Sequence, residues 1–185
     1  MEKLKESVHA YELEMADQRE AVKQARLHSV EEDRRVLQER FIEERCLLQA
    51  SNAWVGAVKL VDYLKQEGYT DAELLMPEKE QHPFSLYISW NVDPHESGSG
   101  DEIRRYFQIT PRLETGYLDF YGGKHIRLSK DECGQVGENG LTRLEEVMLD
   151  LYKHSALSTK AQLYQRGLAK ISVFLIDNES PSTPQ

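Results

Sequence analysis

The sequence is poor in cysteine and in apolar runs, and each shortage excludes a class of protein. Two cysteines among 185 residues, Cys46 and Cys133, are too few for the disulfide framework of a small secreted scaffold. The longest apolar run, Val173–Ile176, has four residues, whereas a membrane span needs about 18 or more. The first residues also lack the apolar segment of a secretory signal. We therefore expect a cytoplasmic protein with reduced thiols and no membrane contact.

Positive charge is also in short supply. The net charge of −9 and the pI near 5.2 count against generic binding to nucleic acid or to anionic lipid. The hydrophobic fraction of 39% is low and the charged fraction of 30% is high, which indicates an elongated molecule with much helix surface in water. Residues 84–130 differ, because they contain as many basic as acidic side chains.

A regular apolar spacing over residues 1–50 predicts a long, coiled-coil-like helical segment. A stripe this narrow requires another helix, either from this chain or from a second copy, so its apolar members form a predicted oligomerisation site. The capping-box pattern that begins at Ser29 allows either a second helix or a change of phase. We favour one uninterrupted or slightly kinked helix, because no glycine or proline interrupts it. The stripe contains Leu4, Val8, Tyr11, Met15, Val22 and Ala25, with Gln18 as its polar member.

The following segment predicts a second helix over residues 53–66, apolar nearly all round and therefore deeply buried. Gly68 is placed to end this helix in the left-handed conformation. A second capping box, Thr70–Glu73, predicts a short turn of helix that Pro77 closes.

The period then changes from helical to alternating over residues 84–129, which predicts a four-stranded antiparallel meander. The strands are expected at 84–92 and 103–109, then around Leu118 and around Ile126. Gly122 and Gly123 are suited to a tight hairpin between the last two.

Two helices, 141–155 and 159–176, are expected to follow the sheet, and a disordered tail is expected over 179–185. A fifth strand at Ile171–Ile176 is the alternative to the end of the second helix, because that run is rich in β-branched residues. The expected fold class is α+β, with an N-terminal helical segment over 1–50 and an α+β domain over 51–178.

Few residues are spaced for chemistry. The six histidines do not pair with each other or with cysteine at metal-ligand spacing, so we expect no metal and no cofactor. Cys133 has His125 and two acids, Asp131 and Glu132, nearby in sequence. A small cysteine-dependent enzyme is thus an alternative, although proximity in sequence carries little weight for a catalytic group.

The most distinctive pattern lies on one face of the predicted sheet. If the apolar residues of the strands face the core, the two-residue period places tyrosines and arginines together on the opposite face. Such residues are enriched in binding hot spots. Two interpretations without a binding function remain. Tyrosine favours strands and arginine aids solubility, or the N-terminal helices cover this face. The predicted binding residues are Tyr87, Arg104, Tyr106, Tyr117, Tyr121 and Arg127.

These patterns together predict a non-enzymatic macromolecular binding protein, an adaptor, chaperone or regulator. It would act through a helical oligomerisation arm and the tyrosine- and arginine-rich sheet face. The expected partner is a protein, with a homodimer through the N-terminal helix. Nucleic-acid binding by the sheet face is the first alternative.

Overall fold

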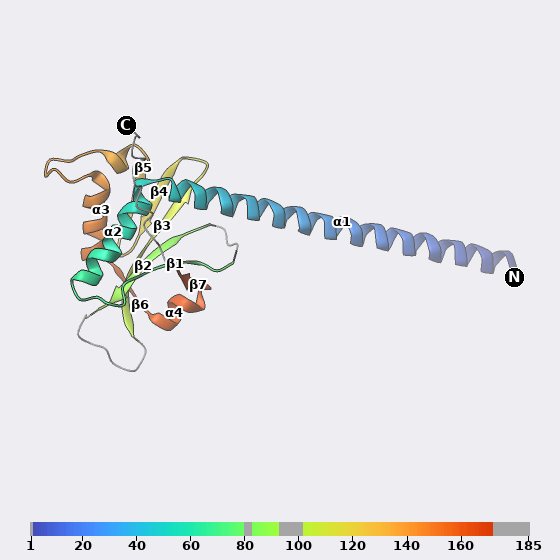
Figure 1. Ribbon diagram of the computed structural model, residues 1–185. Coiled ribbons are helices and arrows are strands. Elements are labelled where there is room, and N and C mark those ends of the chain that lie inside the picture. The colour runs from blue at the N-terminus through green and yellow to red at the C-terminus, as the bar shows by residue number, and fades with distance from the viewer. Residues whose placement is uncertain (1, 80–82, 93–101, 172–185) are drawn as a thin grey trace, which may run out of the picture. The chain divides into compact units, whose positions relative to one another are not determined.

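The computed structural model describes residues 2–79, 83–92 and 102–171, and the chain divides into two structural units, residues 1–40 and 41–185 (Figure 1). The division falls inside the first helix. In the part of the chain that the structure describes, no helix is long and apolar enough to cross a membrane.

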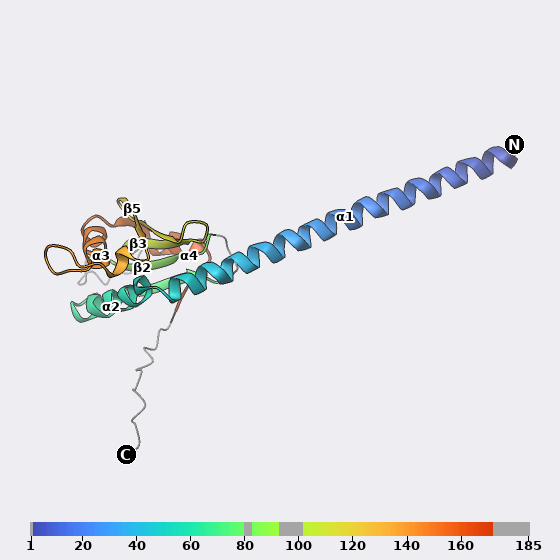
Figure 2. The same ribbon diagram turned by 90° about the horizontal axis from the view of Figure 1, so that it is seen from above.

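The first helix, α1 (Glu2–Gln49), is continuous over 48 residues, as Figures 1 and 2 show. The prediction of a long N-terminal helix is therefore confirmed. Ser29 lies within the helix and begins no second one. Arg35 bonds Glu32 and Glu39, one turn away on either side, at 2.6 Å each. Ion pairs at these spacings support an exposed helix.

The last turns of α1, from Phe41 onward, belong to the second unit and pack against its core. Phe41 and Leu48 are buried, and the Phe41 ring meets Phe84 edge to face at 5.3 Å. Glu44 is also buried, and its Oε2 accepts a hydrogen bond from the Phe84 backbone N–H at 2.7 Å. This contact satisfies a backbone donor just before the strand Leu86–Asn91.

Within the described residues, the sheet of the second unit has seven strands, all paired antiparallel. The α+β class and the antiparallel sheet are confirmed, but the expected number of four strands is wrong. Along the sheet the order is β5-β4-β3-β2-β1-β7. The strand β6 pairs with the first half of β3, and β4 pairs with the second half. The strands are β1 (Glu73–Pro77), β2 (Leu86–Asn91), β3 (Ile103–Arg112), β4 (Tyr117–Tyr121), β5 (His125–Ser129), β6 (Ala156–Thr159) and β7 (Leu168–Lys170).

Helices cover both faces of this sheet. On one face lie α2 (Asn52–Gln66) and α3 (Arg143–Lys153), which run side by side in both views (Figures 1 and 2). Their buried residues join those of the strands in the main core, together with the 3₁₀ turn Glu132–Gly134. On the other face, the short helix α4 (Lys160–Gln165) places Leu163 in a smaller apolar cluster with strand residues.

The segment after α2 is a strand where a turn of helix was expected. All five residues of β1 are buried, so the strand shows no alternation that could announce it. The acid of the supposed capping box, Glu73, instead pairs with Arg104 of β3, as does the neighbouring Asp71. The capping pattern is therefore satisfied by tertiary contacts.

The last predicted helix, 159–176, is also wrong, because α4 ends at Gln165. Gly167 adopts a φ of +70°, a left-handed conformation that reverses the chain into β7. The apolar residues read as one helical face are thus divided between a helix and a strand, with Leu163 and Leu168 both buried. The Ile171 N–H donates to the Leu74 carbonyl at 3.0 Å and continues the strand pairing. The rest of Ile171–Ile176 and the predicted tail lie outside the described residues.

The hairpin between β4 and β5 generates a stability prediction. The Gly123 N–H donates to the His154 carbonyl at 2.6 Å, and a Cβ at Gly123 would lie 2.0 Å from that same oxygen. Gly123→Ala should therefore lower the free energy of unfolding by about 2 kcal/mol or more, measured by urea denaturation.

Gly134→Ala is the matched control, because a Cβ there meets its nearest neighbour, Asn52 Nδ2, at an ordinary 3.7 Å. This variant should be neutral, or stabilised by up to about 1 kcal/mol. Equal stabilities for the two variants would contradict the close packing of the hairpin on the end of α3.

Candidate functional site

The predicted sheet face exists, but it is divided into a covered and an open part. The register pairs Tyr87 with Gln108 and Gln108 with Tyr121, so these side chains share one face across three strands. By the same alternation all six predicted binding residues lie on this side of the sheet, opposite the main core. The α4 helix packs over the β1–β2 end of the face, where its Leu163 meets Leu75 of β1 and Leu168 of the edge strand β7.

Arg104 lies in the covered part and is fully buried, so the expectation of an exposed binding arginine is wrong. Its Nε donates to the Ser89 hydroxyl at 2.6 Å, and its Nη2 lies 3.2 Å from the Glu73 carboxylate. Asp71 pairs with Nη1. A buried guanidinium needs such partners, because an uncompensated charge in a core is strongly destabilising. Arg104 therefore ties β1, β2 and β3 together.

Tyr87 and Tyr106 are also half covered. Their rings lie 6.3 Å apart and pack against the cluster of Leu75, Leu163 and Leu168. Burial raises the pKa of the Tyr87 hydroxyl above its usual value. The cover over this part of the face thus comes from α4.

The open part of the face is organised by Asp119, which is fully buried at the centre of β4. Its carboxylate accepts hydrogen bonds from Arg127 Nε at 2.6 Å and from Arg112 Nε at 2.7 Å. The His125 Nε2 lies 3.2 Å from the same carboxylate, and the Tyr121 hydroxyl donates to it at 3.2 Å. We call these residues the Asp119 cluster: Arg112, Asp119, Tyr121, His125 and Arg127.

Aromatic rings complete this surface. Tyr121 stacks on His125, with ring centres 4.4 Å apart, and Arg127 lies 5.9 Å from the centre of the Tyr117 ring. Three of the predicted residues, Tyr117, Tyr121 and Arg127, therefore come together, and Arg112 and His125 join them. The one signal for this arrangement in the sequence was a single acid, Asp119, in the middle of an otherwise basic and aromatic face.

The electrostatic state of Asp119 follows from two opposed effects. Burial acts to raise the pKa of this carboxyl, but hydrogen bonds from Arg127, Arg112 and His125 outweigh it and hold the pKa well below its usual range. The carboxylate is thus charged at neutral pH. It balances one of the two arginines, so the Asp119 cluster keeps one net positive charge on an acidic protein.

The proposed cysteine chemistry finds no support in the geometry. Cys133 is buried in the main core, and burial raises the pKa of its thiol to about 11. A nucleophilic cysteine needs a lowered pKa and access to substrate. His125 is bound to Asp119 on the opposite face of the sheet. Among the residues that the structure describes, no group of three or more His, Cys, Asp or Glu side chains could hold a metal ion.

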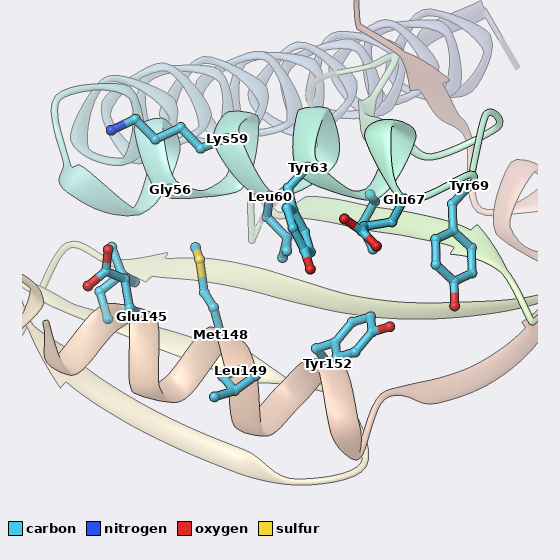
Figure 3. Close-up of a pocket in the computed structure, with 12 residues that line it drawn as sticks. Gly56, Lys59, Leu60, Tyr63, Glu67, Tyr69, Glu145, Met148, Leu149 and Tyr152 are labelled. Atoms are coloured by element: carbon cyan, nitrogen blue, oxygen red, sulfur yellow. The ribbon is translucent and has the colours of Figure 1, made fainter. Parts of the chain in front are cut away.

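A groove of about 480 Å³ opens between α2 and α3, on the main-core side of the sheet (Figure 3). The residues that line it come from sequence positions nearly a hundred apart, so no local pattern announced it. Its floor is apolar, with Leu60, Leu64 and Met148, and tyrosines stand at one end. The volume lies in the range of small-molecule sites.

The predicted oligomerisation residues lie in the first structural unit. Every described residue of positions 2–40 is exposed, apart from Met15, which is partly buried. Four members of the stripe are exposed by half or more of their surface: Leu4 65%, Val8 50%, Tyr11 63% and Val22 53%. The apolar stripe of α1 is therefore exposed to water.

No family model, curated protein or solved structure matches the chain.

The Asp119 cluster generates a prediction on pH. Because the folded-state pKa lies below the unfolded value of about 3.8, the carboxylate stabilises the fold above pH 4, and this stabilisation is lost as the pH falls further. Asp119→Asn should lower the free energy of unfolding at pH 7 by about 2 kcal/mol. This loss of unfolding free energy is smaller than the loss expected when a fully buried ion pair is broken, because Arg112 and Arg127 are both partly exposed to water. The variant should also weaken the acid dependence between pH 4 and pH 2.

Asp150→Asn serves as the control, because Asp150 pairs with Lys124 at the surface at 3.0 Å. Exposed pairs contribute about 1 kcal/mol or less. Urea denaturation across pH 2–7 distinguishes the two positions. An Asp119→Asn curve parallel to the native one would show that the cluster does not hold this carboxylate's charge.

Proposed function

We propose that this chain is a non-enzymatic binding protein that associates with a second copy through its N-terminal helix and presents its α+β unit to a macromolecular partner. The observation that carries the proposal is the exposed apolar stripe of α1 from Leu4 to Ala25. Helices are stabilised in proteins mostly by packing an apolar face, so a stripe left in water calls for a partner.

The spacing of the stripe favours a helix as that partner. Its apolar residues recur by four and three, which is the seam of a coiled coil, with side chains of one helix fitting between those of the other. Six of the seven positions are apolar or tyrosine, and Gln18 is the exception. A single polar seam residue is a known means of setting register.

The charges beside the stripe favour a second copy, aligned in parallel. In that arrangement Glu14 on one side of the seam faces Arg19 of the other helix, five positions further along. The symmetry of the pair repeats this contact, so two attractive pairs form. Charge complementarity of the helix with itself is the reason to name a second copy.

The Asp119 cluster supports a second contact, with a protein. It offers arginine and tyrosine side chains in fixed positions on an open sheet face, and such residues dominate binding hot spots. A protein partner with an acidic patch suits its positive surplus. The nucleic-acid alternative loses one of its two predicted arginines, since Arg104 is buried and paired with acids.

The seam is tested by molar mass. Light scattering on the full chain should give a dimer, and replacing both Val8 and Met15 by aspartate should give a monomer with the same thermal midpoint for the α+β unit. Leu13→Asp is the matched control, because Leu13 is 54% exposed but lies off the stripe. A monomeric native chain would contradict the proposal, as would dissociation by the control variant.

Charge exchange tests the parallel alignment. Glu14→Arg should weaken the dimer by roughly fivefold to tenfold, because two attractive pairs become repulsive. Adding Arg19→Glu to the same chain restores opposite charges and should restore the affinity, measured by analytical ultracentrifugation at low salt. Independent, additive effects of the two changes would exclude this pairing.

A further inference from the structure

The end of the α2–α3 groove gathers three tyrosines and one glutamate around a common space. We propose that this groove binds an organic cation, an ammonium head group attached to an apolar chain. The inference is independent of the association of α1 and of the Asp119 cluster.

The groove is narrow at one end and open at the other. At the narrow end α2 contributes Gly56, where an added Cβ would lie 3.1 Å from Met148 Cε and 3.2 Å from Leu144 Cδ2. The absence of a side chain at Gly56 thus lets the helices approach closely there. Beyond Lys59 and Glu145 the two helices leave space between them, lined by Leu60 and Met148 (Figure 3).

The tyrosines stand at the open end. Tyr63 of α2, Tyr69 of the following loop and Tyr152 of α3 lie around the same space in Figure 3, and the Glu67 carboxylate lies between them. Tyr152 is held in place, because its ring stacks on the buried Trp90 at 5.7 Å with 18° between the planes. Ring faces that enclose a space attract a cation through their electron-rich surface.

Charge supports a cationic head group over a neutral or anionic one. The groove is lined by two acids, Glu67 and Glu145, and one base, Lys59, which attracts Glu145 at the other end. Glu67 therefore supplies the negative charge among the tyrosines. The net charge of −9 adds a field that repels anions and draws cations to the surface.

The apolar half of the groove sets the rest of the ligand. Leu60, Leu144, Met148 and Leu149 line the space next to the tyrosines, so an alkyl or aryl chain attached to the ammonium group would be removed from water. Methionine is flexible and adapts to chains of different shape. Quaternary ammonium compounds with a short alkyl chain have both required parts.

The test uses the full chain and three probes with the same chain length: hexyltrimethylammonium, hexanol and hexyl sulfate. Isothermal titration should show binding of the cation, with hexanol and hexyl sulfate at least tenfold weaker. Equal affinity for the three probes would reduce the site to a non-specific apolar groove, and no binding of the cation would overturn the proposal.

Variants place the binding at the tyrosines. Glu67→Gln and Tyr63→Leu should each weaken binding of hexyltrimethylammonium by roughly fivefold to tenfold, in line with the strength of partly exposed cation–π and charge contacts. Tyr63→Phe retains the ring face and should bind as the native chain does. Asp62→Asn changes the same charge on the same helix away from the groove and should also leave binding unchanged. Loss with Asp62→Asn equal to that with Glu67→Gln would mean that only the overall charge matters.

The position of the probe can be read directly. The chain has four methionines, and of the described ones only Met148 lines the groove. Its methyl signal should shift on addition of hexyltrimethylammonium, while that of Met76 on the sheet stays in place. A shift of Met76 without Met148 would place the cation elsewhere and contradict the proposal. The native chain and its variants should share one thermal midpoint, since Tyr63 is 54% exposed.

Discussion

The buried guanidinium of Arg104 is the interaction on which the arrangement of the sheet depends. Its charge is matched by Asp71 before β1 and by Glu73 within β1, and Ser89 of β2 accepts from its Nε. The Tyr164 hydroxyl of α4 then bonds Glu73 at 3.2 Å. A core charge that is compensated this fully specifies which strands are neighbours. It also requires cover, and α4 supplies that cover.

This cover decides which surfaces remain for function. It removes Arg104 from the surface and half covers Tyr87 and Tyr106, so the open part of the sheet face lies around Asp119. The second open feature is the groove between α2 and α3, on the other face of the sheet. The third belongs to the other structural unit, the apolar stripe of α1. Each of these three surfaces is rich in the types of side chain that occur in binding sites. Cys133, by contrast, is buried in the core, and burial raises the pKa of its thiol.

Much of the fold could be predicted where the local pattern and the tertiary environment agree. The alternation of apolar and polar residues in β2 to β5 predicts a sheet with one apolar face, and the helical spacing of apolar residues predicts α2 and α3. The misses share a cause. β1 is buried on both faces and shows no period, β6 and β7 have four and three residues, and the turn at Gly167 interrupts an apolar spacing that reads as helical.

The candidate site was predictable to a smaller extent, for a physical reason. The two-residue period places a side chain on a face, and all six sheet residues were assigned to the correct one. It cannot report what covers that face, because α4 packs there through tertiary contacts of Leu163 with Leu75 and Leu168. The tyrosine groove was invisible in the sequence, since its parts come from α2, the loop after it and α3.

The central claim, that two copies meet along α1 in parallel, is tested most directly by distances between spin labels. Labels would be placed at Ala10→Cys or Gln24→Cys, off the apolar stripe, in a chain with Cys46→Ser, since Cys46 is exposed. Helices that pack about 10 Å apart in parallel and in register give one short distance at each site, and nearly the same distance at both. An antiparallel pair would give a long distance at one site or at both, because equivalent residues separate by about 3 Å for each residue away from the midpoint of the pair. The absence of any dipolar coupling would show that the helices do not meet.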